Sequence, residues 1–189
     1  MQCVILAAGE GSRMRPLTTS RPKVMLPLAG KPSLEHLIRN VKAAGISDII
    51  IVVGYREEAI RSYFGDGSEF GVSIKYVVQR KQLGTADALR TAEPFVTDTF
   101  LMLNGDMVVD VEDLTKICET KAPVMAVSTT THPEDFGVVT LSGDKISSLE
   151  EKSPEPKSNI INAGAYLFGC EIFETLKKGI KNGQNSILK

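Results

Sequence analysis

This sequence has few cysteines, few histidines and a net charge close to zero. Its 189 residues contain three widely spaced cysteines, with no Cys-x-x-Cys pair, and two histidines. A disulfide framework is not expected from so few cysteines, and a zinc site is not expected because it needs several cysteine or histidine ligands at short spacing. The formal charge of -1 gives no electrostatic reason to expect a nucleic acid as partner. These absences favour an ordinary globular protein.

Long hydrophobic runs are also missing. The longest, VILAA and IIIVV, are far shorter than the roughly 20 apolar residues that span a bilayer. The N-terminus lacks the basic region and the apolar stretch of a signal peptide. We therefore expect a cytoplasmic protein with no membrane partner.

Short β-rich runs alternate with amphipathic stretches over the first hundred residues. The runs IIIVV and FLML are continuously apolar, which is typical of strands buried on both faces. This pattern predicts an α/β fold, a Rossmann-like doubly wound, mainly parallel sheet. Ser33 is expected to cap the first helix and Gly45 to end it. Ligands of such sheets gather at the carboxyl ends of the strands.

The pattern changes after about residue 124. The segments VMAVSTTT and FGVVTL, the turn SGDK and the segment ISSLEE predict a β-hairpin region. A loop, the strand GAYLF and a helix from Glu171 to Lys178 follow. We expect one domain, 1–189, with a first part over 1–123, a second part over 124–178 and a tail over 179–189.

The glycine-rich stretch LAAGEGSRM follows the first predicted strand. A dinucleotide fingerprint needs a third glycine where this chain has Met14, and a P-loop needs Gly-Lys-Ser/Thr where it has Ser12 and Arg13. What remains is a glycine pair followed by Arg13 and Arg15, with Lys23 further on, which suits a triphosphate. The alternative is a glycine-rich turn with incidental surface arginines.

Two further signals lie at the ends of predicted strands. Asp106, in LNGD, is placed to ligate Mg2+ between phosphates, although Asn-Gly-Asp is also a common turn. The amide of Gln79 donates and accepts side by side, which suits the imide edge of a pyrimidine, and Gly84 allows the backbone to approach a flat base. The alternative is a solvated glutamine before a helix.

Taken together, these segments resemble the sugar-phosphate nucleotidyltransferases, which make nucleoside-diphosphate sugars from an NTP and a sugar 1-phosphate. The resemblance covers residues 1 to about 178 and depends on motifs that occur in the family's order: LAAGEGSRMRPLT with RPKVMLPLAGKP, QLGTADAL, LNGD, FGVV, LEEK and NAGAYLF. It implies that residues 1–123 bind the nucleotide and that the hairpin region over 124–178 is a sugar-binding subdomain.

The resemblance also implies a role for each matching residue. The nucleotide would be held by Leu6, Ala8, Gly9, Gly11 and Arg13. The base would contact Gln79 and Gly84. The catalytic residues would be Arg13, Lys23 and Asp106, with Asp106 also binding the cofactor Mg2+. The sugar would contact Gly137, Glu151 and Asn162, and its phosphate Lys152.

The implied reaction is an in-line attack of the sugar 1-phosphate on the α-phosphate of the NTP, with pyrophosphate leaving. UTP or dTTP and glucose or N-acetylglucosamine 1-phosphate are favoured. A mannose-1-phosphate guanylyltransferase and a non-catalytic, pyrophosphorylase-like regulatory or scaffolding subunit remain open. A molybdopterin-type enzyme ranks low, because Arg13 and Lys23 are ten residues apart. A homo-oligomer is compatible with the resemblance.

The chain departs from the family pattern at two places. Ser153 follows the lysine of LEEK, where the commoner motif has proline. The family's further metal-binding aspartate lies beyond the NAGAYLF segment, whereas the last aspartate here is Asp144. Many relatives also carry a carboxyl-terminal β-helix. We therefore expect this chain to be the amino-terminal part of a longer protein, and the alternative is a shortened, weakly active form. The activity of the piece alone is left open.

Overall fold

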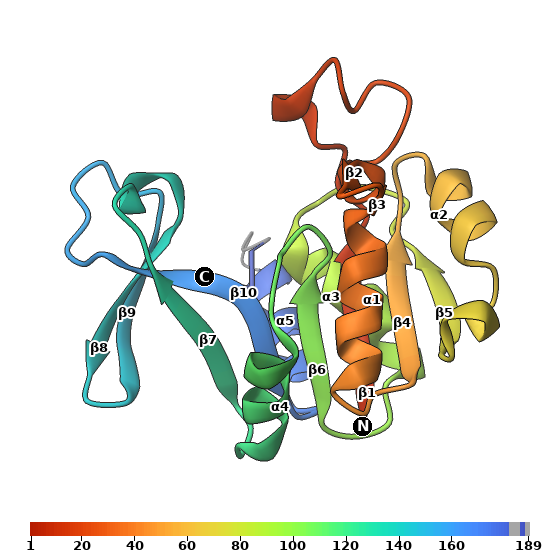
Figure 1. Cartoon of the computed structure of the whole chain (residues 1–189). Helices are drawn as coiled ribbons and strands as arrows, with labels where there is room; N and C mark the ends of the chain where they lie inside the picture. The colour runs from red at the N-terminus through yellow and green to blue at the C-terminus, as the bar shows by residue number, and fades with distance from the viewer. Residues whose placement is uncertain (182–185, 188–189) are drawn as a thin grey trace.

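The computed structural model describes residues 1–181 and 186–187, and in this part eight strands form one sheet (Figure 1). Four neighbouring strands are parallel: β5 (Ser73–Val78), β4 (Asp48–Val53), β1 (Gln2–Ala7) and β6 (Phe100–Asn104). The chain runs from β1 outward through β4 to β5 and then returns to the other side of β1 as β6. This reversal is the topological switch point at which ligands of such sheets bind.

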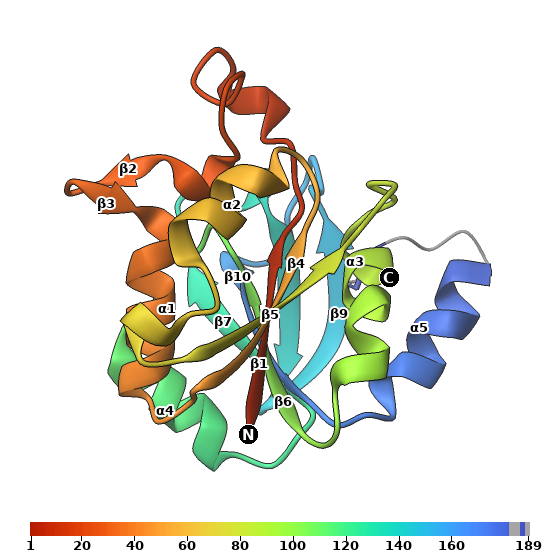
Figure 2. The same ribbon diagram turned by 90° about the vertical axis from the view of Figure 1, so that its right-hand side faces the viewer.

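Alternating side chains of the strands enter two apolar layers. Cys3, Ile5 and Ala7 of β1 face one layer, whereas Val4 faces the other. The first layer is covered by α1 (Ser33–Ala43), α2 (Glu57–Phe64) and α4 (Val111–Glu119), and the second by α3 (Thr85–Ala92) and α5 (Ile172–Lys181) (Figure 2). Both faces of the sheet are therefore buried, which explains the continuous apolar runs.

Antiparallel strands extend the sheet beyond β6. The long strand β10 (Ile160–Phe168) pairs with β6 and also with β7 (Val124–Thr129) and β8 (Gly137–Ser142). β8 and β9 (Lys145–Glu151) form the predicted hairpin, which lies to one side of the parallel strands in Figure 1. A short ribbon of β2 (Pro27–Leu28) and β3 (Lys31–Pro32) precedes α1.

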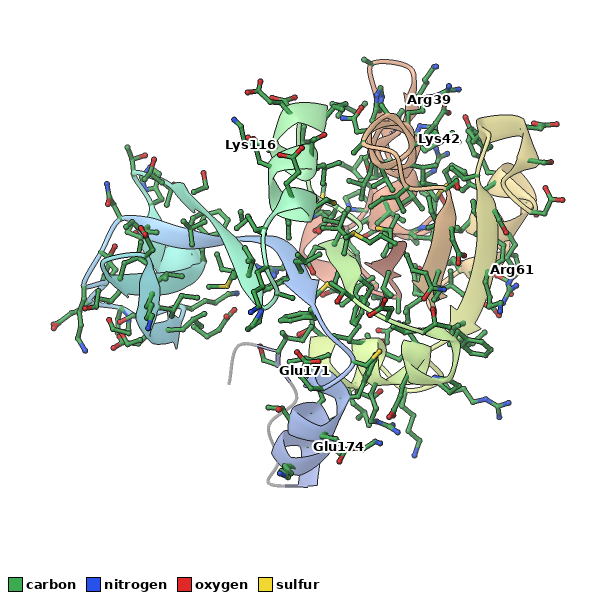
Figure 3. All side chains as sticks on the ribbon, turned by 90° about the horizontal axis from the view of Figure 1, so that it is seen from below. Arg39, Lys42, Arg61, Lys116, Glu171 and Glu174 are labelled. Atoms are coloured by element: carbon green, nitrogen blue, oxygen red, sulfur yellow. The ribbon has the colours of Figure 1, made fainter. Side chains whose placement is uncertain are left out.

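Charged side chains cover the outside of the helices. Figure 3 shows Lys42 of α1, Lys116 of α4 and Glu174 of α5 pointing away from the sheet. Lys116 forms a surface ion pair with Glu112, one turn earlier in α4, at 2.9 Å. Within the described part of the chain, every helix is too short or too polar to cross a bilayer.

The predicted architecture is confirmed, with local corrections. Gly45 ends the first helix in the left-handed region, at φ 89°, as expected. The cap was wrong: α1 begins at Ser33 itself, and the Ser33 hydroxyl donates to the carbonyl of Val24 at 3.0 Å. The last helix begins at Ile172 and ends at Lys181, not at Glu171 and Lys178. Sequence reasoning missed α4 and the β2–β3 ribbon.

Candidate active site

A cavity of about 890 Å3 opens at the carboxyl ends of β1 and β6. Its wall is built by the loop after β1, the start of α3, the end of β6, the β8–β9 hairpin and β10. Every residue predicted for the site lies in this wall: Leu6, Ala8, Gly9, Gly11, Arg13, Lys23, Gln79, Gly84, Asp106, Gly137, Glu151, Lys152 and Asn162. Segments up to 156 residues apart in sequence thus meet at one place, although their roles remain predictions.

The loop after β1 is held in shape from several sides. Gly11 has φ 64°, and a Cβ there would lie 3.0 Å from Lys23 Cβ and 3.1 Å from Thr18 Cγ2, so glycine is strongly favoured. The buried Thr18 hydroxyl donates to the Gly11 carbonyl at 2.9 Å. The hydroxyl of Tyr55, in the loop after β4, donates to the carbonyls of Thr18 at 3.1 Å and Thr19 at 2.9 Å. This bracing fixes the loop that carries Arg13 into the cavity.

Arg13 and Arg15, the two arginines next to the glycine pair, lie in different surroundings. Arg13 lines the cavity and makes no side-chain hydrogen bond or ion pair with the described residues. Arg15 pairs instead with Glu10 at 2.8 Å on the exposed side of the loop. Of the two arginines, Arg13 is therefore the one whose guanidinium lies at the cavity.

Lys23 and Asp106 form an ion pair inside the cavity, 83 residues apart in sequence. Lys23 Nζ lies 2.5 Å from Asp106 Oδ2, and the two side chains are 40% and 41% exposed. Gly105 brings the aspartate there, because its N–H donates to the Leu6 carbonyl at 2.9 Å and a Cβ would lie only 2.8 Å from that oxygen. A cation and a hard oxygen ligand thus meet at the switch point between β1 and β6.

The carboxylates of the cavity fit a metal ion that is bound jointly by the protein and a ligand better than one bound by protein groups alone. In residues 1–181 and 186–187, no cluster of three or more histidine, cysteine or acidic side chains could hold a metal ion. Among the described residues, the carboxylates that line the cavity are those of Asp106, Asp135 and Glu151, and Asp106 is the one that contacts Lys23. Mg2+ commonly takes one or two carboxylates and completes its shell with phosphate oxygens and water. The donor set therefore fits Mg2+ that arrives with a polyphosphate.

The predicted base-binding residue is buried and already hydrogen-bonded. Gln79 is 5% exposed, and its Nε2 donates to the Gly84 carbonyl at 3.1 Å and to Asp87 Oδ2 at 3.0 Å. Gln79 was expected to donate and accept side by side, but the structure uses its amide protons internally. Sequence reasoning missed both Asp87 and Gln82, whose Nε2 donates to the Ala8 carbonyl at 2.9 Å.

The opposite wall is built on β10. Asn162 accepts from the Gly164 N–H at 3.0 Å and donates to the Tyr166 hydroxyl at 2.5 Å. Burial raises the pKa of Tyr166 to about 12, so the phenol stays neutral. The charge of Glu151 also raises this pKa, whereas the hydrogen bond from Asn162 lowers it. Asn104 and Tyr166 also line the cavity, and neither was predicted from the sequence.

The hairpin contributes Lys152 through an unusual backbone conformation. Lys152 lies in the left-handed region at φ 48°, and its N–H donates to the Phe136 carbonyl at 2.9 Å. Such a conformation is costly for a residue with a Cβ. The Ser153 hydroxyl, where the commoner motif has proline, donates to the Glu155 carbonyl at 3.1 Å. The turn after β9 thus closes with serine.

A Rossmann-like α/β domain with a cavity at its switch point is typical of a class of nucleotide-binding folds. Residues 2–189 match the family of nucleotidyl transferases, to which the chain belongs. The bifunctional protein GlmU of Methanocaldococcus jannaschii is 43% identical over 179 residues, which are 94% of this chain and 42% of that protein. A mannose-1-phosphate guanylyltransferase of Mycobacterium tuberculosis is 36% identical over 95% of this chain and 52% of its own length.

Solved structures agree on the fold. A Bacillus anthracis protein assigned as a glucose-1-phosphate thymidylyltransferase superposes with a TM-score of 0.85 and 35% identity, over 94% of this chain and 75% of the other. The chain spans about half the length of the curated relatives it matches. The relatives are nucleotidyltransferases that differ in base and sugar, so membership alone does not select the substrates.

Proposed function

We propose that this domain transfers a nucleotidyl group from an NTP to a sugar 1-phosphate and releases pyrophosphate. The observation that carries the proposal is the Lys23–Asp106 pair at the switch point, in the same cavity as Arg13 and the hairpin residue Lys152. Cations on two sides of one cavity suit two phosphorylated substrates. Nucleotidyl transfer requires such an arrangement, because positioning of the substrates and neutralisation of their charge supply most of the catalysis.

The chemistry needs no general base. A phosphate oxygen of the sugar 1-phosphate is already negative at neutral pH and attacks the α-phosphorus of the NTP. The new P–O bond forms as the bond to the bridging oxygen breaks, and the electron pair leaves with pyrophosphate. Lys23 and Arg13 would neutralise the charge that develops on the transferred group. Lys152 would hold the attacking phosphate.

Asp106 would hold Mg2+ together with the phosphates. The metal would supply charge neutralisation at the leaving group. Lys23 contacts Oδ2 of this carboxylate at 2.5 Å, and the other oxygen, Oδ1, would be the one to take the metal. Lys23 would thus lie beside both the metal and the phosphates.

For the substrates, we propose UTP or dTTP with glucose or N-acetylglucosamine 1-phosphate. The guanine and mannose pair is the second candidate, because a relative that is 36% identical over 186 residues is a mannose-1-phosphate guanylyltransferase. Uracil, thymine and guanine all carry a ring N–H, which the carbonyl oxygen of Gln79 could accept. The choice among them is a matter for assay.

The test is pyrophosphate release across a panel of NTPs and sugar 1-phosphates, with protein expressed from its natural start to its natural stop codon. We expect turnover with at least one pair, and loss of it in Lys23→Ala and in Asp106→Ala. Lys116→Ala, a surface lysine of α4 outside the cavity, is the matched control and should keep full activity. Nucleotide binding without turnover for any pair would favour the non-catalytic alternative.

A further inference from the structure

Asp87 is a nearly buried carboxylate in the first turn of α3. It is 6% exposed and has two partners: Arg90, which donates to Oδ1 at 2.8 Å, and Gln79, which donates to Oδ2 at 3.0 Å. Burial raises the pKa of Asp87, but the bonds from Arg90 and Gln79 outweigh it, and the net pKa is lowered. The group is therefore ionised at neutral pH and can only accept hydrogen bonds.

The bonds to Gln79 determine which way its amide points. Nε2 carries two protons, and both go to atoms that only accept: Asp87 Oδ2 and the Gly84 carbonyl. Rotating the amide by 180° would bring Oε1 against these two oxygens and lose both bonds. The amide is thus held with its protons turned toward Asp87 and Gly84, which leaves Oε1 as the polar atom available to the cavity that Gln79 lines.

We infer that Asp87 is a positioning residue that makes Gln79 a pure acceptor and thereby selects the base of the nucleotide. The inference rests on the proposed function, in which Gln79 faces the base. A base with a ring N–H at its pairing edge, as in uracil and thymine, can donate to Oε1. Cytosine presents a ring nitrogen lone pair there, so two acceptors would face each other. Such a site rejects a base that does not match, here cytosine, because the acceptor Oε1 of Gln79 is then left without a hydrogen-bond donor.

The same geometry predicts the effect of removing the charge. In Asp87→Asn the side chain offers an N–H as well as an oxygen, so a rotated Gln79 amide finds a donor for Oε1. The preference for one orientation weakens, and cytosine finds an N–H of Gln79 opposite its lone pair. Arg90→Gln is the matched control, because it removes the other partner of Asp87 and leaves the carboxylate on Gln79.

The experiment measures dissociation constants for UTP and CTP with Mg2+ by calorimetry, so it does not depend on turnover. We expect the unmodified protein to prefer UTP by about tenfold or more, Asp87→Asn to prefer it by only a few-fold, and Arg90→Gln to match the unmodified protein. In a Gln79→Ala background, Asp87→Asn should leave the UTP to CTP ratio unchanged, because its effect passes through the amide. Asp87→Ser, whose hydroxyl donates or accepts, repeats the test if the asparagine variant does not fold.

Each result decides the matter. An unchanged ratio in a folded Asp87→Asn or Asp87→Ser variant overturns the role of Asp87 and leaves the proposed function intact. The role of Asp87 is also overturned if Asp87→Asn changes the UTP to CTP ratio as much in the Gln79→Ala background as in the unmodified protein, or if Arg90→Gln changes it. Either result points to a general structural effect. No preference for UTP in the unmodified protein overturns the selection. Failure to bind any NTP overturns the proposed function itself.

Discussion

Gly105→Ala tests the close approach of β6 to β1 that brings Asp106 to the site. A Cβ at Gly105 would lie 2.8 Å from the Leu6 carbonyl oxygen and 3.2 Å from Val24 Cγ1. Ordinary contact begins near 3.4 Å, so the two strand ends must separate by about 0.6 Å. Separation also stretches the 2.9 Å bond from the Gly105 N–H to Leu6. Overpacking of this kind costs about 1–3 kcal/mol, which lowers Tm by about 2–12 °C in a chain of this size.

The same displacement should weaken the site. Asp106 follows Gly105 directly and is the proposed metal-binding carboxylate, so its displacement should weaken the binding of NTP with Mg2+. Thermal unfolding and nucleotide affinity are measured together for Gly105→Ala and for the control Gly9→Ala. No described atom lies within 4 Å of a Cβ at Gly9, so that variant should keep its Tm and lose only affinity. An unchanged Tm in Gly105→Ala would refute the packing argument.

Three further predictions concern stability and reactivity. Glu35 is 3% exposed; burial raises its pKa, but the bonds from Tyr63, Arg39 and Lys31 lower it to about 2 from an ordinary 4.5. The contribution of ionised Glu35 to the free energy of unfolding is therefore present above about pH 4.5 and lost toward pH 2. Urea titrations should show Glu35→Gln less stable than the unmodified protein by about 1–3 kcal/mol at pH 7, and this difference should vanish in acid. A difference that does not change with pH contradicts the prediction. Tyr55→Phe, without the bonds to the loop carbonyls, should lose about 0.5–1.5 kcal/mol and bind NTP more weakly in the same calorimetry. A thiol reagent should modify the exposed Cys170 first and the buried Cys3, whose pKa burial raises, only on unfolding; a fast phase that survives in Cys170→Ser would contradict this.

The parallel sheet was predictable because its strands are buried on both faces. Burial on two sides forces the continuous apolar runs of β4 and β6, and such runs are visible in sequence. The first helix cap was not predictable in the same way, since the hydroxyl of Ser33 bonds to Val24 across a tertiary contact. The missed helix α4 did carry a signal: Leu114 and Ile117 are spaced for one buried face.

The candidate site was predictable as a set of residues and less so as a network. Glycines, cations and Asp106 stand in short motifs, and the sheet topology brings strand ends together whatever the intervening sequence. The contact of Gln79 with Asp87 joins a strand end to the first turn of the next helix, so only the fold reveals it. An acidic residue in a first helical turn is ordinarily explained by the helix dipole, so the sequence gives no sign of its hydrogen bond with Gln79.

The central claim is that the α-phosphate of the nucleotide, and not the γ-phosphate, passes to the sugar 1-phosphate. Parallel reactions with [α-32P]UTP and [γ-32P]UTP, each with Mg2+ and a panel of sugar 1-phosphates, test it directly, and dTTP and GTP labelled in the same two positions extend the panel. We predict that the α-label appears in a nucleoside-diphosphate sugar and the γ-label in pyrophosphate, and that both products vanish in Lys23→Ala. Label from the γ-position in the sugar product, or no labelled product with any pair, would contradict it.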